Sequence, residues 1–169
     1  MRTQPAWHIE LLADHPDLIP AVGEMRWREW SHWRDPPESE AVTWWVDVAR
    51  RESGRAELPV TFVGLDAGGA LAGAAGIDRF DPPEFQDRGP WVIGVIVAPA
   101  LRGQGAGRAL LAHALRWAAG QAYDPVWVAT GPEAAGFYQR CGWELTHTYH
   151  REHHDGAIHI LRHRDGVSA

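Results

Sequence analysis

Three glycines at every second position, Gly103, Gly105 and Gly107, separate a β-branched segment from one rich in leucine and alanine. The order VIVAPALRGQGAGRALLAHAL predicts a strand, a turn and a helix in succession. The first amide groups of a helix have no intrahelical acceptor, and the aligned peptide dipoles give that end positive potential. Because glycine has no Cβ, a phosphate can approach such amides closely. The spacing indicates an anion site with Arg108 as an added charge, although a glycine-rich connector without a ligand has the same pattern.

Two other phosphate motifs do not fit this segment. A P-loop needs Lys and then Ser or Thr after its last glycine, and here Arg108 and Ala109 follow it. A dinucleotide fingerprint needs Gly or Ala three residues after its second glycine. Counted from Gly103 or from Gly105, that position holds Arg108 or Leu110. Both motifs are therefore excluded.

The segment VIVAPALRGQGAGRAL resembles the acetyl-CoA signature of the GNAT N-acetyltransferase superfamily, whose core is Gln/Arg-x-x-Gly-x-Gly/Ala. Arg102, Gly105 and Gly107 stand at the positions of that core. A second segment, AAGFYQRCGWEL at 134–145, resembles the helix and Tyr-x-x-x-Gly-Phe/Trp turn that follow in the family. The two segments stand in the family's order, and the resemblance extends over about 60–164.

The resemblance implies acetyl-CoA as co-substrate, and the spacing of the histidines near the end of the chain gives no reason to expect a metal. The main chain of Val95–Val97 would pair with the pantetheine arm, and an amide near Val95 would donate to the thioester carbonyl. The segment from Arg102 to Arg108 would bind the pyrophosphate. The implied cofactor-binding residues are Val95, Ile96, Val97, Arg102, Gly103, Gln104, Gly105, Ala106, Gly107 and Arg108.

The resemblance also implies an acid, because the tyrosine of the family's turn protonates the departing thiolate. That residue is Tyr138 here, and packing as a core aromatic is its alternative role. The attacking amine must lose a proton, and many relatives carry a glutamate early in the strand before the glycine turn. The corresponding stretch, Trp91–Gly94, contains no acid, so Asp78 and Glu29 become the candidate bases, with a water chain as an alternative. Many relatives also have a cofactor-contacting Asn where this chain has Gly131.

The acceptor is expected to be a small cationic amine. The chain has 16 basic and 22 acidic side chains and a net charge of −6, which suits a cationic partner. Tryptophan faces attract cations, so we expect Trp30, Trp33 or Trp91 to contact the acceptor, although aromatics at helical spacing more often build a core. An aminoglycoside-like antibiotic is one acceptor of this type, which would mean antibiotic resistance. A peptide or protein amine, or a non-catalytic acyl-CoA sensor, are the alternatives.

Length and pattern predict one domain over 1–169 of the α/β class, with a mixed central sheet of six to seven strands flanked by helices on both faces, and the resemblance implies that it has the GNAT fold. Residues 1–59 would form the acceptor-side helices, and 60–164 the sheet and acetyl-CoA-binding core. Asp14 or Asp17 is expected to cap the first helix and Ser39 the second. We expect strands at 8–12, 60–65, 70–80, 91–97, 126–129, 143–151 and 157–164, and helices at 17–30, 39–51, from 105 and at 133–140.

Other functional classes receive little support from the sequence. The acidic balance argues against nucleic-acid binding, and the absence of a long apolar run argues against a membrane span. Cys141 is the only cysteine, so the chain has no internal disulfide and is expected to be cytoplasmic. A homodimer is left open. The spacing of the late histidines, which are His147, His150, His153, His154 and His159, matches no established metal-ligand set.

Overall fold

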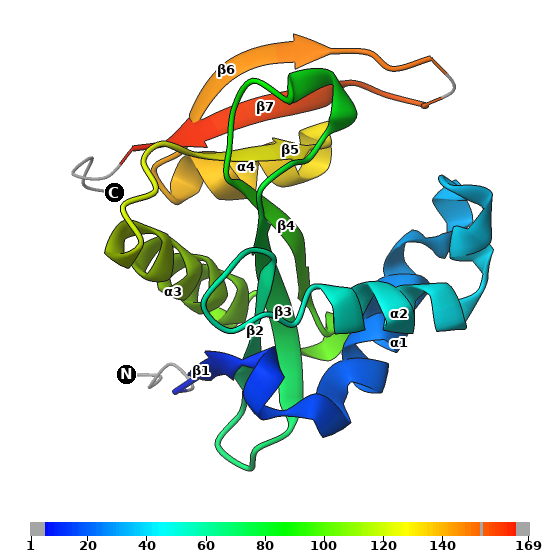
Figure 1. The fold of residues 1–169 in the computed structure, drawn as a ribbon, viewed down its shortest axis with the longest axis vertical. Coiled ribbons are helices and arrows are strands. Elements are labelled where there is room, and N and C mark those ends of the chain that lie inside the picture. Colours follow the sequence, from blue (N-terminus) through cyan, green and yellow to red (C-terminus); the bar gives the residue numbers. More distant parts are fainter. Residues whose placement is uncertain (1–5, 153, 165–169) are drawn as a thin grey trace. The chain divides into compact units, whose positions relative to one another are not determined.

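The computed structural model describes residues 6–152 and 154–164. They contain a mixed sheet of seven strands, in the order β1-β2-β3-β4-β5-β7-β6, and four α-helices (Figure 1). The strands are β1 (His8–Leu11), β2 (Val60–Leu65), β3 (Leu71–Asp78), β4 (Trp91–Val97), β5 (Val126–Thr130), β6 (Glu144–Tyr149) and β7 (Ile158–His163). The helices are α1 (Ile19–Trp30), α2 (Val42–Arg51), α3 (Ala106–Gly120) and α4 (Pro132–Arg140). The expected α/β class and mixed sheet are confirmed.

The described residues divide into two compact units. The first contains the described part of 1–77 together with Gly94–Ala114. In it β1, β2 and β3 pair antiparallel, and α1 packs against α2. One of its apolar cores joins the 3-10 turn Leu12–Asp14 to α1, α2, β2, β3 and β4 through Leu12, Ile19, Val22, Ala49, Val63, Leu65, Ala74 and Ile96.

The second unit contains Asp78–Ile93 and the described part of 115–169. Trp91 and Val92 of β4 pair in parallel with β5, which pairs antiparallel with β7, and β7 pairs antiparallel with β6. Its core is more aromatic, because Trp91, Ile158 and Ile160 pack with Phe85, Ile93, Trp127, Ala129 and Tyr149. None of the helices in the described ranges is long and apolar enough to cross a membrane.

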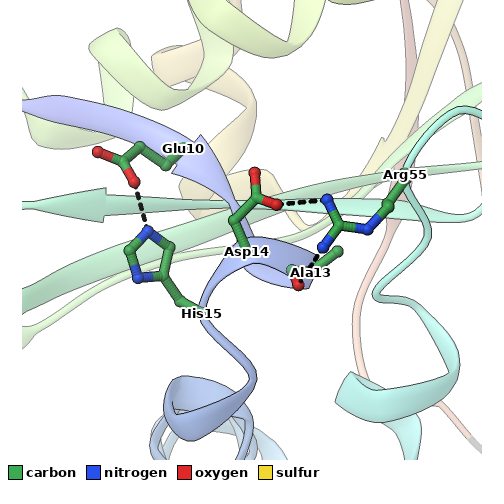
Figure 2. A network of polar contacts seen from close by, with 5 residues as sticks. All are labelled: Glu10, Ala13, Asp14, His15 and Arg55. Carbon is green, nitrogen blue, oxygen red and sulfur yellow. Dashed lines mark hydrogen bonds and ion pairs between the residues drawn. The ribbon is translucent and has the colours of Figure 1, made fainter.

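The predicted N-caps are wrong. The helix α1 begins at Ile19, with Leu18 as its N-cap, no side-chain cap and a proline in its first turn, where a residue lacking an N–H costs no helical hydrogen bond. Asp14 instead pairs with Arg55, which also donates to the carbonyl of Ala13 at 2.9 Å (Figure 2). Figure 2 also shows the bond between His15 and Glu10 beside this pair.

Ser39 does not cap α2, because it lies in the preceding 3-10 turn, Pro37–Glu40, and the helix begins at Val42 after Ala41. The carbonyl of Ser39 accepts a hydrogen bond from Nε1 of Trp45 at 2.8 Å. The indole N–H of Trp45 therefore satisfies one backbone carbonyl just before the helix begins.

Candidate functional site

The glycine-rich turn of the first unit connects β4 to α3. The amide of Ala98, just after β4, donates to the carbonyl of Ala72 at 2.8 Å, which holds the end of β4 beside β3. Gly103 and Gly105 have φ of +76° and +88°, a region that strongly favours glycine. A Cβ at Gly103 would meet nothing within 4 Å, so the space beside the turn is open. The predicted strand, turn and helix are therefore present, with open space where an anion must approach.

The N-terminus of α3 directs amide groups toward this turn. The bond from the amide of Ala109 to the carbonyl of Gly105, at 3.0 Å, closes the first turn of the helix. The amides that precede Ala109 in the helix have no intrahelical acceptor, and the helix dipole adds positive potential there. This end of α3 can therefore bind a phosphate through its main chain.

Side chains of the turn hold the turn in place. Nε of Arg102 donates to the carbonyl of Val97 at 3.0 Å, and its Nη2 donates to Oε2 of Glu29 at 2.9 Å. The amide of the Gln104 side chain donates to the carbonyl of Ala100 at 3.2 Å. Arg102 thus joins the end of β4 to α1, and Glu29, one of the two candidate bases, is its ion-pair partner.

A bend in β4 lies just before the strand segment expected to hold the pantetheine arm. Gly94 has φ of +56°, and a Cβ there would stand 2.6 Å from Nη2 and 2.8 Å from Cζ of Arg26. Arg26 is 1 % exposed. Its Nη1 donates to Oε2 of Glu52, the residue after α2, at 2.6 Å.

Arg26 does not stand out by motif, although the sequence contains a signal for it. The buried residues of α1 are Ile19, Val22, Gly23 and Arg26, the i, i+3, i+4, i+7 stripe of an amphipathic helix. A charged residue on that apolar stripe needs a buried partner. Its place in the helical periodicity is therefore enough to mark Arg26 as unusual.

Tryptophans form a cluster at the C-terminal end of α1. The rings of Trp30 and Trp33 are stacked, with centroids 6.3 Å apart, and Trp45 lies 5.8 Å from Trp30. Trp33 is 56 % exposed. An exposed indole face backed by other rings is a surface to which a cation can bind.

The candidate acid, Tyr138, belongs to the second unit. It is 5 % exposed and packs edge-on against Phe137 and Trp143, at centroid distances of 5.2 and 5.4 Å. Burial raises the pKa of the Tyr138 hydroxyl well above its ordinary value, and the neighbouring Cys141 raises it further. The hydroxyl therefore keeps its proton through the neutral range, as an acid requires.

Asp78 and Trp91 also lie in the second unit. Oδ1 of Asp78 accepts a hydrogen bond from the amide of Arg79 at 2.6 Å. Trp91 is 0 % exposed, and its Nε1 donates to the carbonyl of Arg88 at 3.0 Å. Full burial with a satisfied indole N–H is typical of a core residue, so Trp30 and Trp33 are better placed than Trp91 to contact an acceptor.

Two of the late histidines, His147 and His159, make ordinary side-chain contacts. His147 packs against Phe85 at 4.9 Å, and Nδ1 of His159 bonds Oγ1 of Thr148 at 2.7 Å. His153 lies outside the described residues. Across 6–152 and 154–164, no group of three or more His, Cys, Asp or Glu side chains is placed to hold a metal ion.

The chain matches the acetyltransferase (GNAT) family over residues 19–143. No curated protein matches it significantly in sequence. Its fold is similar to that of a spermidine N-acetyltransferase chimera from Vibrio cholerae and hSSAT, with 16 % identity, 96 % of both chains covered and a TM-score of 0.69. A protein assigned as a phosphinothricin N-acetyltransferase has 19 % identity over 94 % of this chain and 98 % of its own, with a TM-score of 0.69.

A third similar structure contains a bound ligand. It is a protein assigned as a streptothricin acetyltransferase from Bacillus anthracis str. Ames, in complex with acetyl coenzyme A. Its identity to this chain is 15 %, over 68 % of this chain and 66 % of its own, with a TM-score of 0.58. Because all three identities are 19 % or lower, these structural similarities show a shared fold and nothing about the substrate.

Proposed function

This chain belongs to the acetyltransferase (GNAT) family, and we propose that it transfers an acetyl group from acetyl-CoA directly to a primary amine of a small cationic acceptor. The observation that carries the proposal is the open turn at Gly103 and Gly105, which leads into the N-terminus of α3. This arrangement suits a diphosphate, because main-chain amides and a helix dipole bind an anion without any side-chain charge.

The residues present fit acetyl-CoA. The open space at Gly103 leaves room for the diphosphate, and Val95 and Val97 of β4 are half-buried, so a pantetheine arm can reach the strand. When bound, acetyl-CoA supplies an activated thioester. Arg102 would order the turn through the carbonyl of Val97 rather than act as a free phosphate-binding charge.

The chemistry requires one acid and one base. The amine nitrogen forms a bond to the thioester carbon, the C–S bond breaks, and the departing thiolate takes a proton from Tyr138, whose raised pKa keeps the hydroxyl protonated. The proton of the amine passes to Glu29, to Asp78 or to water. Glu29 is held by Arg102 at 2.9 Å, so its service as a base requires that this pair open.

The acceptor is inferred from charge and aromatic surface. Trp30 and Trp33 offer stacked rings at the end of α1, and the net charge of −6 attracts cations over a longer range. A small polyamine or an aminoglycoside-like antibiotic has the required amine and charge, and antibiotic inactivation in the cytoplasm would be the corresponding role.

Calorimetry with CoA and acetyl-CoA tests the binding half of this proposal. We expect both to bind the unaltered protein and to bind weakly to Gly103→Val, whose side chain enters the turn. Gly69→Val is the matched control, because Gly69 in the β2–β3 hairpin has a similar φ of +83° and also nothing within 4 Å. Absence of binding to the unaltered protein would overturn the proposal.

Thiol release from acetyl-CoA across a panel of amines tests the chemical half. Steady turnover with polyamines or aminoglycosides is the expected result and would exclude a non-catalytic sensor. Turnover with peptides alone would replace the small acceptor by a peptide amine. Binding of acetyl-CoA with no turnover on any amine would favour the sensor.

A further inference from the structure

Arg26 is a buried cation that the proposed reaction does not use. Its side chain is 2 % exposed and that of its partner, Glu52, is 18 % exposed. A buried charge is costly unless it is paired and its remaining hydrogen-bonding groups are satisfied. One ion-pair bond, from Nη1 to Glu52 at 2.6 Å, meets only part of that requirement.

The other two nitrogens of this guanidinium lack partners. Among the described residues, neither Nε nor Nη2 of Arg26 has a hydrogen-bond acceptor, and both atoms are buried. A buried donor that makes no hydrogen bond lowers the stability of the fold. Such locally unfavourable features are concentrated at functional sites. Among these residues, the positive charge near Nε and Nη2 has no hydrogen-bonded acceptor beside it, since Glu52 bonds to Nη1.

The guanidinium lies against the bend in β4. A Cβ at Gly94 would stand 2.6, 2.8 and 3.0 Å from Nη2, Cζ and Nε of Arg26, three atoms of one plane at nearly equal distance. The flat group therefore fills the place of the missing side chain. With φ of +56° at Gly94, the main chain turns at this contact, one residue before the amide expected to face the thioester at Val95.

We propose that Arg26 is a positioning residue for acyl transfer: its guanidinium braces the bend at Gly94 and places positive charge behind the main chain of Val95. This inference rests on the proposed function. As the amine nitrogen bonds to the thioester carbon, the carbonyl electron pair moves onto oxygen, and the amide of Val95 would donate to that oxyanion. Collapse of the oxyanion breaks the C–S bond. A fixed charge in a region of low dielectric favours the oxyanion at no reorganisation cost.

The test compares substitutions that separate the charge of Arg26 from its packing. R26M keeps most of the volume and loses the charge, whereas R26K keeps the charge and loses the flat face. E52Q breaks the same ion pair and leaves the charge at Gly94. R28M is the control on the same helix, because Arg28 is 70 % exposed and pairs with Glu24.

We expect kcat of R26M to fall about 10- to 100-fold, less than the roughly 100- to 1000-fold loss on removing an oxyanion donor itself, because Arg26 acts through the main chain of Val95. The Kd for CoA, which has no acyl oxygen, should stay unchanged, while the preference for acetyl-CoA over CoA should fall. R26K should have an intermediate kcat, E52Q a much smaller loss than R26M, and R28M none. The double variant R26M/E52Q contains no unpaired buried charge, so it should fold even where R26M does not, and show the same loss of kcat.

Each other outcome decides against a specific claim. Normal kcat in R26M or in R26M/E52Q, with CoA bound normally, would overturn the role of Arg26 and leave the proposed function standing. Equal losses of kcat in E52Q and R26M would overturn the role of the Arg26 charge, because E52Q leaves that charge in place. Failure of the unaltered protein to bind CoA would overturn the proposed function and this inference together.

Discussion

Arg26 in the first unit and Arg151 in the second each pair with a glutamate, in opposite surroundings. The Arg151 and Glu84 side chains are 30 % and 36 % exposed, and two N–H···O bonds of 2.7 and 3.0 Å join them. The Arg26 and Glu52 side chains are 2 % and 18 % exposed, and a single bond joins them. The better-satisfied pair is therefore the one that water already stabilises. If only stability mattered, the buried pair would be the one with the more complete hydrogen bonding. The incomplete bonding of Arg26 therefore requires another explanation.

A second arginine of the second unit shows the same contrast. The guanidinium of Arg88 lies 4.8 Å from the ring centroid of Phe85 and 5.0 Å from that of Trp127. It also bonds to Asp87 at 2.9 and 3.2 Å. Rings cover the guanidinium of Arg88 and a carboxylate compensates its charge, whereas two of the three guanidinium nitrogens of Arg26 are buried beside a glycine without an acceptor in the described part of the chain. Arg162 of the second unit is intermediate, because it bonds to Glu144 and lies over Trp127 but leaves its Nε unsatisfied by any described residue.

The largest stability effect is expected for Glu52→Gln. Removing this carboxylate leaves Arg26 buried without a counter-charge, which should lower the free energy of unfolding by about 3 kcal/mol. Urea denaturation followed by tryptophan fluorescence measures this change. A loss as small as that of an exposed pair would show that the burial of Arg26 is not costly and would remove the contrast between the two units.

Tyr138→Phe should give the next largest effect, on rate rather than stability. Loss of a general acid lowers kcat by about 100-fold or more, while the Kd for CoA should stay close to that of the unaltered protein. Because burial raises the pKa of Tyr138, the hydroxyl does not titrate near neutral pH and should produce no alkaline decline in kcat below about pH 10. Steady-state kinetics against pH tests both points, and an unchanged kcat would remove Tyr138 as the acid.

Gly94→Ala should have a smaller effect on stability. A left-handed alanine costs about 1–2 kcal/mol, and its Cβ would also displace the Arg26 guanidinium. Gly69→Ala has the same backbone cost without a neighbour within 4 Å. The difference between the two variants in thermal unfolding measures the contact with Arg26, and equal losses would mean that the contact is easily relieved.

The smallest effect is expected for Glu84→Gln. The hydrogen bond from Arg151 holds the pKa of Glu84 below its ordinary value of 4.5, so the pair stabilises the fold above that pH. This stabilisation is lost as the pH falls through the lowered pKa of the folded state. With both side chains about one-third exposed, the loss at pH 7 should be below about 1 kcal/mol. Unfolding of both proteins at neutral pH and at about pH 3 should show a smaller difference at the acid pH.

The features predicted well from the sequence are those that local chemistry decides. The order of β4, turn and α3 follows from valine and isoleucine, then glycine, then leucine and alanine. The positive φ at Gly103 and Gly105 needs no information from elsewhere in the chain. The predicted caps of α1 and α2 are wrong because the helices begin later, at Ile19 and Val42, and because Asp14 is bound to Arg55, which is 41 residues away in the sequence.

The candidate site is predictable only in part, for the same reason. Glu29 can be predicted as a base but not as an ion-pair partner, because Arg102 is 73 residues away in the sequence. The importance of Arg26 depends on Glu52 and Gly94, which come from two other parts of the chain. Such contacts between distant segments are invisible to periodicity and spacing. The roles of Asp78, Glu29 and Tyr138 remain predictions.

The two bonds of Arg102 have a thermodynamic consequence. One side chain joins the last carbonyl of β4 to a carboxylate on α1, so a molecule that draws the guanidinium away from Glu29 alters the ionic environment of that helix. Linkage is reciprocal: if filling the turn by one ligand strengthens the binding of a second ligand near Glu29, the second must strengthen the first by the same factor.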